Sequence, residues 1–288
     1  MGIGLLCMLG VFVLWSIIPV LIKLLFPVFD PFTIAFLRLA QGTAVVLAVF
    51  FARGHRPWTM PWSWWHLVGG LGISLNFSLY ALSLSYTTAS AGVLIVQIQY
   101  VTLAVLAAAV LKERLGVAKI ASIAVVLTGV ALVVGVRADV GHLLAPRYML
   151  GNVLMLFSGI GWGVYGLANK ALAQQAQTVQ ILAPMLTISA LVTGALAATH
   201  FEVRAAPTAE ALWIILVLGV LATGGPFILV SEGLKRLSAA LVGTLIASTS
   251  IGQITLAHWL LGEPLGWSLA AGGLLILIGV LGMVNAER

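Results

Sequence analysis

The sequence predicts an all-α polytopic membrane protein whose ten transmembrane helices form two inverted repeats of five. Of its 288 residues, 61% are hydrophobic and 8% are charged, against about 25% charged residues in an average globular protein. A helix needs about 20 apolar residues to cross the hydrocarbon of a bilayer, so the chain has room for about ten crossings. Little of it then lies outside the membrane, which excludes a soluble catalytic domain. The 14 Lys and Arg residues are scattered, which argues against a nucleic-acid partner.

Five apolar stretches make up the first half, separated by proline, glycine, tryptophan and charged residues. The first begins near residue 3 without a basic segment before it and is too long for the apolar part of a signal peptide, so we expect a retained span. A cluster of tryptophans, Trp58 among them, precedes the third stretch, as expected for an aromatic belt at the membrane interface. The predicted spans are 3–26, 31–52, 63–85, 88–111 and 115–136.

Five further apolar stretches follow a connection at 137–147, which we expect in the periplasm. Each is again about the length that a helix needs to cross the bilayer. The predicted spans are 149–170, 178–199, 210–234, 238–261 and 265–285.

The distribution of basic residues predicts the orientation of the chain. With the N-terminus in the cytoplasm, nine Lys and Arg residues fall on the cytoplasmic side and three on the other, while Lys23 and Arg38 lie within spans. This bias follows the positive-inside rule and puts both chain ends in the cytoplasm. The nine are Arg53, Arg56, Lys112, Arg114, Lys119, Lys170, Lys235, Arg236 and Arg288, and the three are Arg137, Arg147 and Arg204.

The two halves of the sequence resemble each other. Trp15 precedes Lys23 by the same eight residues that separate Trp162 from Lys170. An L-x-E-x-L pattern between spans four and five recurs between spans nine and ten. Because each copy holds an odd number of spans, the second copy must cross the membrane inverted relative to the first, with a cavity where the halves meet. The predicted repeats are residues 2–136 and 148–285.

Two five-span halves that each end in an L-x-E-x-L turn and a glycine-bearing helix resemble the drug/metabolite transporter superfamily, in its ten-helix EamA-type branch. The resemblance implies a transporter and the direction of transport, which is export. By chain length and by in-span aromatic and amide residues, the chain is most similar to the aromatic amino acid exporters of that superfamily. Members commonly carry a proline where this chain has Tyr100 and Ser250, so the resemblance does not imply that spans four and nine bend.

Polar and aromatic residues within the spans predict a substrate-binding cavity. Asn76 and Tyr80, for example, are four residues apart and share one face of span three. Buried amides and hydroxyls need partners, which either a cavity or a neighbouring helix can supply. Trp and Tyr walls with a few amides suit an amphipathic solute with a flat apolar body and a small polar end. The predicted substrate-binding residues are Trp15, Asn76, Tyr80, Gln97, Tyr100, Trp162, Tyr165, Ser248 and Gln253.

Charged residues in or near the spans have structural interpretations. Glu113 and Glu263 lie just ahead of the following span, where the positive end of the helix dipole stabilises a carboxylate. For Lys23 and Lys170 we expect side chains that reach toward the interface, with contact to a substrate carboxylate as the alternative. Arg38 resembles an arginine common in the family, which implies a role in packing or helix orientation.

Glycine clusters in spans six and eight predict close helix packing, or hinges that allow the halves to move. Span six carries several glycines around Trp162, and span eight carries two glycines followed by a proline. The candidate hinge residues are Gly159, Gly163, Gly224, Gly225 and Pro226.

The predicted function is a secondary transporter of the bacterial inner membrane that exports small amphipathic metabolites, above all aromatic amino acids, by alternating access. The partners are the substrate and the lipid bilayer, and a monomer is compatible with the sequence. Neither a cofactor nor a metal is expected, since the chain lacks a G-x-x-x-x-G-K-[ST] motif and an H-E-x-x-H motif. Export of other metabolites or drugs, a channel, and a polytopic membrane enzyme remain as alternatives, although no cluster of catalytic residues favours the enzyme.

Overall fold

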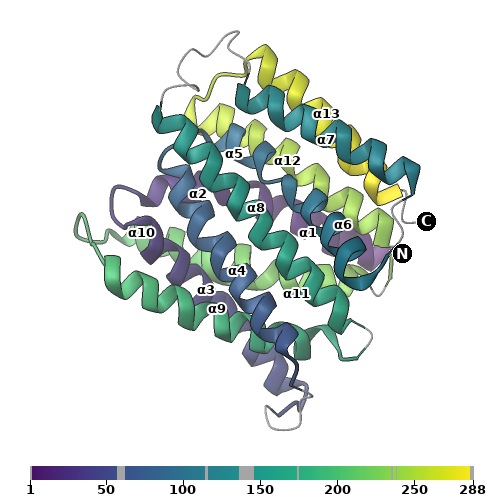
Figure 1. Ribbon diagram of the computed structural model, residues 1–288. Helices are drawn as coiled ribbons and strands as arrows, with labels where there is room; N and C mark the ends of the chain where they lie inside the picture. The colour runs from purple at the N-terminus through teal and green to yellow at the C-terminus, as the bar shows by residue number, and fades with distance from the viewer. Residues whose placement is uncertain are drawn as a thin grey trace.

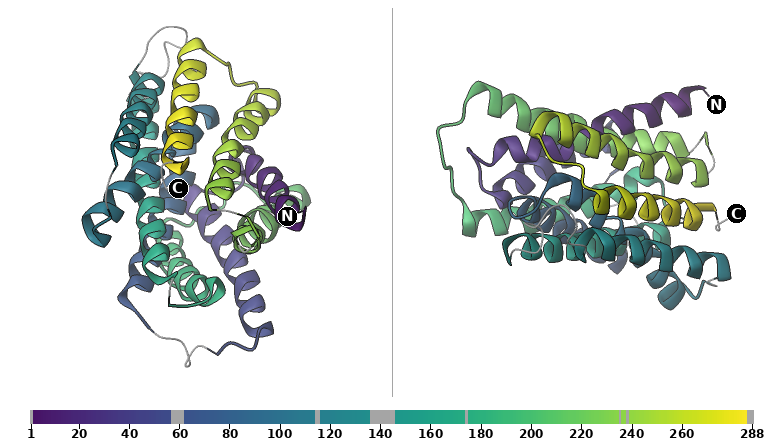
Figure 2. Two further views of the ribbon diagram at one scale, coloured as in Figure 1. Left: turned by 90° about the vertical axis from the view of Figure 1, so that its right-hand side faces the viewer. Right: turned by 90° about the horizontal axis from the view of Figure 1, so that it is seen from above.

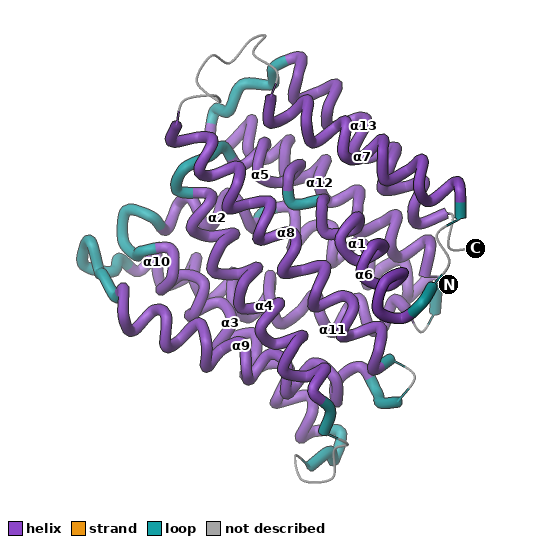
Figure 3. Tube along the Cα trace, in the orientation of Figure 1, coloured by secondary structure: helices purple, strands orange, loops and turns teal. Residues whose placement is uncertain are grey.

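The computed structural model describes residues 2–56, 62–113, 116–135, 146–173, 175–234, 236–237 and 239–285. In this part of the chain each predicted span is helical, and Figure 3 shows helices joined by short connections, with no strand. Trp58 and most of the predicted 137–147 linker lie outside the described residues. The helices are α1 (Gly2–Ser16), α2 (Ile18–Leu25), α3 (Pro31–Ala52), α4 (Trp64–Leu84), α5 (Ala89–Ile95), α6 (Ile98–Leu111), α7 (Val117–Gly135), α8 (Pro146–Leu172), α9 (Thr178–His200), α10 (Ala209–Leu216), the π-helix η2 (Val217–Gly224), α11 (Gly225–Leu234), α12 (Ala239–Leu261) and α13 (Trp267–Asn285).

Seven helical segments of the described chain are long and apolar enough to cross a membrane. Two shorter apolar helices lie within α7 and α13. Both chain ends lie at the same end of the helix bundle (Figures 1 and 2), as an even number of crossings requires. The total of ten crossings and the cytoplasmic position of the ends stay predictions. The seven segments are Gly2–Leu25, Pro31–Ala52, Trp64–Leu84, Ala89–Leu111, Tyr148–Leu172, Thr178–His200 and Ala209–Val230.

Three spans that the sequence predicts as continuous are interrupted. The first breaks at Ile17, where Pro19 lies in the first turn of the new helix α2 and cannot donate a backbone hydrogen bond. The eighth passes through the π-helix η2, in which the hydroxyl of Thr223 donates to the carbonyl of Leu218 at 2.8 Å. Such π-helical segments occur frequently at functional sites.

The fourth span also breaks, although it has no proline. Its two helices, α5 and α6, are separated at Val96 and Gln97. The side-chain amide of Gln97 donates to the carbonyl of Val93 at 3.2 Å, which satisfies that carbonyl at the end of α5. A glutamine side chain therefore stabilises this break. In span nine α12 runs without interruption from Ala239 to Leu261.

Two pairs of helices that occupy the same position in the two halves pack antiparallel, and α3 with α9 is the first pair. The hydroxyl of Thr43 on α3 donates to the carbonyl of Leu186 on α9 at 3.1 Å, while Phe36, earlier on α3, lies against Gly194, later on α9. The sequence numbers run in opposite directions along the contact. Antiparallel packing of counterpart helices is what inverted halves produce.

The helices α7 and α13, which end the two halves, repeat this arrangement. Gly129 on α7 lies against Gly272 on α13, while Val126 lies against Gly279, so the numbering again runs in opposite directions. Figure 1 shows the two helices side by side along the upper edge of the bundle. Exchanging the two halves also turns the contact between α4 and α8 into the contact between α11 and α1, and both contacts are present.

Glycines bring α4 and α8 into close contact. A Cβ atom at Gly161 would lie 2.8 Å from the carbonyl oxygen of Gly72 and 2.9 Å from the backbone nitrogen of Asn76. Both of these neighbours are backbone atoms, which cannot move aside without shifting a whole helix. This contact sets the spacing of the two helices that carry Asn76 and Trp162, and therefore the width of the space between the halves.

We expect Gly161→Ala to lower the free energy of unfolding by about 1–3 kcal/mol, because the added methyl group forces α4 and α8 apart. Thermal unfolding of the purified protein in detergent measures the change. Gly116→Ala is the matched control, since a Cβ atom at Gly116 would have no neighbour within 4 Å. Equal melting temperatures for the two variants would contradict the role given to this contact.

Candidate functional site

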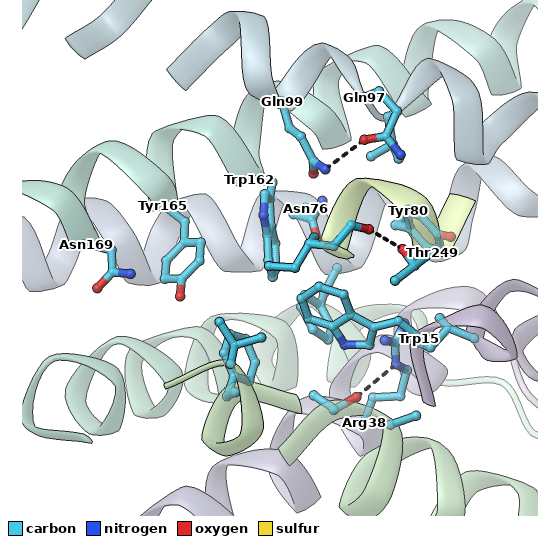
Figure 4. Close-up of a pocket in the computed structure, with 18 of the residues that line it drawn as sticks. Trp15, Arg38, Asn76, Tyr80, Gln97, Gln99, Trp162, Tyr165, Asn169 and Thr249 are labelled. Carbon is cyan, nitrogen blue, oxygen red and sulfur yellow. Dashed lines mark hydrogen bonds between the residues drawn. The ribbon is translucent and has the colours of Figure 1, made fainter. Parts of the chain in front are cut away.

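A cavity of about 300 Å³ lies between the two halves of the chain. Figure 4 shows its lining, which comes from helices of both halves, including the three interrupted spans. Eight of the nine predicted substrate-binding residues line it, although their contact with a substrate stays a prediction. The eight are Trp15, Asn76, Tyr80, Gln97, Tyr100, Trp162, Tyr165 and Gln253.

Ser248 is the predicted residue that does not line the cavity. Its hydroxyl donates to the carbonyl of Leu245 within α12 at 2.7 Å. The next residue, Thr249, lines the cavity instead. Neighbouring residues of a helix point about 100° apart, so an error of one position turns a side chain away from the cavity.

Four of the aromatic rings that line the cavity contact one another. The ring of Trp162 packs edge-on against Trp15 with centroids 6.4 Å apart, and against Tyr165 at 4.9 Å. Phe227 on α11 stacks on Trp162 at 6.1 Å. These rings come from α1, α8 and α11, so the group joins the two halves. Aromatic pairs at such distances contribute about 0.5–1.5 kcal/mol each beyond the area they bury.

The buried amides of the cavity wall are bonded to the protein. The amide nitrogen of Asn76 donates to both the carbonyl and the hydroxyl oxygen of Ser158, at 3.0 Å each, which ties α4 to α8. Gln97 donates to the hydroxyl of Ser250 on α12, and Gln253 donates to the carbonyl of Trp15 at 2.9 Å. These amides therefore act as bonds between helices, one of the two interpretations that the sequence allowed.

The sequence prediction missed several residues of the cavity wall. Thr223 and Phe227 stand in the second half where Asn76 and Tyr80 stand in the first, at the same shift that relates Trp15 to Trp162. Applying the repeat to the polar face of span three would have found both. Gln99 also lines the cavity, as does Thr249, its counterpart at the shift that relates Tyr100 to Ser250. Asn169 lines the cavity too, and no repeat relation marks it.

Arg38 lies on the cavity wall, where the sequence prediction gave it a structural role. Its side chain is buried, with 4% of its surface exposed. The Nε atom donates to the hydroxyl of Thr223 at 3.4 Å, and the guanidinium lies 4.7 Å from the centre of the Phe77 ring. Arg38 is the only charged residue among the described residues that line the cavity.

The cavity extends toward one end of the bundle. Trp162, Tyr165 and Asn169 line it in sequence along α8, as Figure 4 shows, and Thr178 at the start of α9 continues the lining. This end of α8 carries Lys170. The opposite end of the bundle carries Lys23, which does not line the cavity. We refer to these as the Lys170 end and the Lys23 end.

At the Lys23 end, Glu263 binds the start of a helix that it does not precede in the chain. Its carboxylate accepts hydrogen bonds from the backbone nitrogens of Ala89 and Ser90, at 2.6 and 2.8 Å, and from the hydroxyl of Ser90 at 2.7 Å. The expectation that Glu263 stabilises α13, which follows it, is therefore wrong. The helix that it caps is α5, because the connection after α12 folds back over the N-terminus of α5.

Lys23 completes this cluster. Its ammonium lies 3.4 Å from the Glu263 carboxylate and donates to the carbonyl of Thr87 at 2.9 Å. The expectation that Lys23 only reaches toward the interface is therefore corrected to an ion pair. Nδ1 of His258 lies 2.7 Å from the backbone oxygen of Glu263, which holds the connection in place. We refer to Lys23, Glu263 and the N-terminus of α5 as the Lys23-end cluster.

At the Lys170 end, the counterpart residues form a more exposed ion pair. The ammonium of Lys170 lies 2.8 Å from the carboxylate of Glu113, and 38% and 36% of the two side chains are exposed. The Glu263 side chain, in contrast, is 9% exposed. The two ends thus use the same residue types, and the ion pair at the Lys23 end is the less exposed of the two.

The candidate hinge glycines differ in their surroundings. At Gly159 and Gly163 the helix α8 is continuous and packs closely against α6, so these two glycines allow close approach in this structure. Gly224 ends the π-helix η2, and Gly225 and Pro226 begin α11, which places them at a real change of helix type. Movement at any of these positions stays a prediction.

The described residues contain no group of three His, Cys, Asp or Glu side chains that could hold a metal ion. The polar side-chain groups of the cavity wall are amides, hydroxyls, indole N–H groups and one guanidinium, with no carboxylate among the described lining residues. This arrangement can bind a solute through ring stacking, hydrogen bonds and one positive charge.

Several relatives are similar to this chain over most of its length. The uncharacterized inner membrane transporter YhbE of Escherichia coli strain K12 is 25% identical over 287 residues, which cover 98% of this chain and 88% of that protein. An uncharacterized transporter of Archaeoglobus fulgidus is 24% identical over 271 residues, which cover 93% and 92%. One of Haemophilus influenzae is 24% identical over 247 residues, which cover 85% and 79%.

A solved crystal structure has the same fold, with a TM-score of 0.70 at 23% identity and coverage of 99% of this chain and 97% of that one. The EamA-like transporter family matches the chain twice, at residues 2–135 and at residues 149–285. The apolar helices of the chain and these matches together show that the protein is a multi-pass membrane transporter. The chain therefore belongs to the EamA-like transporter family.

Proposed function

We propose that the protein is a secondary transporter of the bacterial inner membrane that exports small amphipathic solutes with a flat apolar body, above all aromatic amino acids. The observation that carries this proposal is the cavity between the halves, where four aromatic rings meet hydrogen-bonding groups. Aromatic walls with a few polar groups favour a flat solute that has one polar end. Export as the direction rests on the resemblance to exporters.

The difference between the two ends supports transport by alternating access. In this conformation the cavity extends toward the Lys170 end, while the Lys23-end cluster joins the two halves and holds the opposite end closed. In the exchanged conformation we expect Glu113 to bind the N-terminus of α12, the counterpart of α5, and Glu263 to release Ala89 and Ser90. Rocking of the halves around a fixed site is the motion that inverted repeats permit.

Counterflow in proteoliposomes tests the proposed substrate class. Vesicles containing the purified protein are loaded with an unlabelled solute, and uptake of the labelled solute is followed with and without a pH gradient. We expect exchange of aromatic amino acids that saturates with concentration, which also distinguishes a carrier from a channel. If no labelled aromatic amino acid exchanges, the aromatic assignment is wrong, and the same panel extended to other metabolites and to drugs tests the alternative class.

We expect Tyr80→Ala and Gln97→Ala to abolish export of toxic aromatic analogues while the protein is still made in normal amounts. Tyr80 forms part of the cavity wall, and Gln97 joins the break between α5 and α6 to α12. Resistance of cells to the analogue and the amount of protein in the membrane are measured together. Tyr148→Ala is the control, because Tyr148 does not line the cavity. Full resistance in both cavity variants would show that the site is wrongly assigned.

A further inference from the structure

Arg38 differs from the other charged residues near the spans in its partners. Lys23 and Lys170 each pair with a glutamate of the opposite half. Among the described residues, Arg38 pairs with no carboxylate, and its recorded contacts are the hydroxyl of Thr223 and the ring of Phe77. A buried charge is normally paired, so its partner at the cavity has to be accounted for.

The guanidinium of Arg38 has more hydrogen-bond donors than it has acceptors among the described residues. Arginine carries five N–H donors in a planar fork and stays protonated in proteins. In the described part of the chain only Nε has a hydrogen-bond acceptor, the Thr223 hydroxyl, so the terminal amino groups have no hydrogen-bond acceptor there. Together these groups form the face of the fork that binds a carboxylate through two parallel hydrogen bonds. The cavity provides the space for such an anion.

We propose that Arg38 binds the carboxylate of the substrate, so that the site selects aromatic solutes that carry an acid group. This inference specifies the site of the proposed function and rests on that function for the statement that the bound solute is transported. Trp15, which like Arg38 lines the cavity, and Trp162 beside it supply the surface for the ring (Figure 4). A solute with an amine and no carboxylate would leave the guanidinium unpaired and place a second positive charge near it.

A set of three matched ligands tests the proposal by binding alone. Phenylalanine, 3-phenylpropionate and phenethylamine share a phenyl ring, and the first two carry a carboxylate that the third lacks. Binding to the full-length protein in lipid nanodiscs is measured by calorimetry. We expect the parent protein to bind both carboxylates about tenfold or more tightly than the amine, as a charge-assisted bidentate pair predicts.

Two substitutions at Arg38 and one control locate the effect. Arg38→Gln removes the charge but keeps an amide donor, and it should bring the ratio of affinities to within about twofold of one. Arg38→Lys keeps the charge but loses the fork, and it should leave an intermediate ratio. The control is Arg204→Gln, because Arg204 is exposed and contacts Glu202 and Phe26 away from the cavity.

The outcomes separate this proposal from the proposed function. A parent protein that binds the carboxylates no more tightly than the amine, or that binds neither, overturns the proposal whether or not the variants fold. Retention of the carboxylate preference in Arg38→Gln overturns it as well. Counterflow with the same ligands then tests transport independently. A carboxylate preference without exchange supports the Arg38 site and refutes export. Exchange without a carboxylate preference supports export and refutes the Arg38 site.

Discussion

Glu263→Ala is expected to lower the free energy of unfolding by about 3–5 kcal/mol and to abolish transport, because a buried ion pair loses one partner. The carboxylate accepts three hydrogen bonds from Ala89 and Ser90 and pairs with Lys23, while the residue as a whole is 8% exposed. Its removal takes the carboxylate away from the partly buried ammonium of Lys23 and from the two backbone N–H groups at the N-terminus of α5. Thermal unfolding of the purified protein and counterflow in proteoliposomes measure the two effects.

Glu113→Ala is the matched control for this prediction. Glu113 occupies the same position in the first half, but its pair with Lys170 is exposed, so the loss in stability should stay within about 1 kcal/mol. Equal losses for the two variants would contradict the tighter closure of the Lys23 end.

An exchange of charges separates the ion pair from the helix cap. If Lys23→Glu is combined with Glu263→Lys, an ion pair is possible again, but a lysine cannot accept hydrogen bonds from the N-terminus of α5. We therefore expect the double variant to stay as unstable as Glu263→Ala. Recovery of the parent stability would mean that the ion pair alone holds the Lys23 end.

The sequence predicts the helical ranges well because hydropathy and length together determine what crosses a bilayer. The repeat adds a relation between distant segments, and so the sequence alone predicts Trp15 and Trp162 at one cavity. Helical periodicity places Asn76 and Tyr80 on a common face, and both line the cavity. Periodicity and duplication are properties of the chain itself, which is why they can be read from one sequence.

Contacts between segments that no periodicity relates could not be predicted. Glu263 was assigned to the helix that follows it, because local sequence says nothing about a helix 174 residues away. The sequence analysis does not predict the break at Gln97 for a similar reason. The side chain of Gln97 bonds both Val93 and the neighbouring helix α12, and the local sequence does not show the contact with α12. For Arg38 the family resemblance implies a packing role, and only the arrangement of the surrounding helices shows that no carboxylate of the described residues pairs with it.

We expect Trp162→Ala to reduce counterflow of aromatic solutes by about tenfold to a hundredfold, because Trp162 contacts Trp15, Tyr165 and Phe227 and holds the aromatic wall together. Loss of one or two ring contacts at about 0.5–1.5 kcal/mol each, together with lost burial of the solute, gives a change of that size. Trp162→Phe should retain part of the activity, since it keeps a ring. Trp259→Ala is the control, because Trp259 is 77% exposed and outside the cavity. If transport is slowed equally by the two alanine substitutions, the aromatic wall is not what binds the solute.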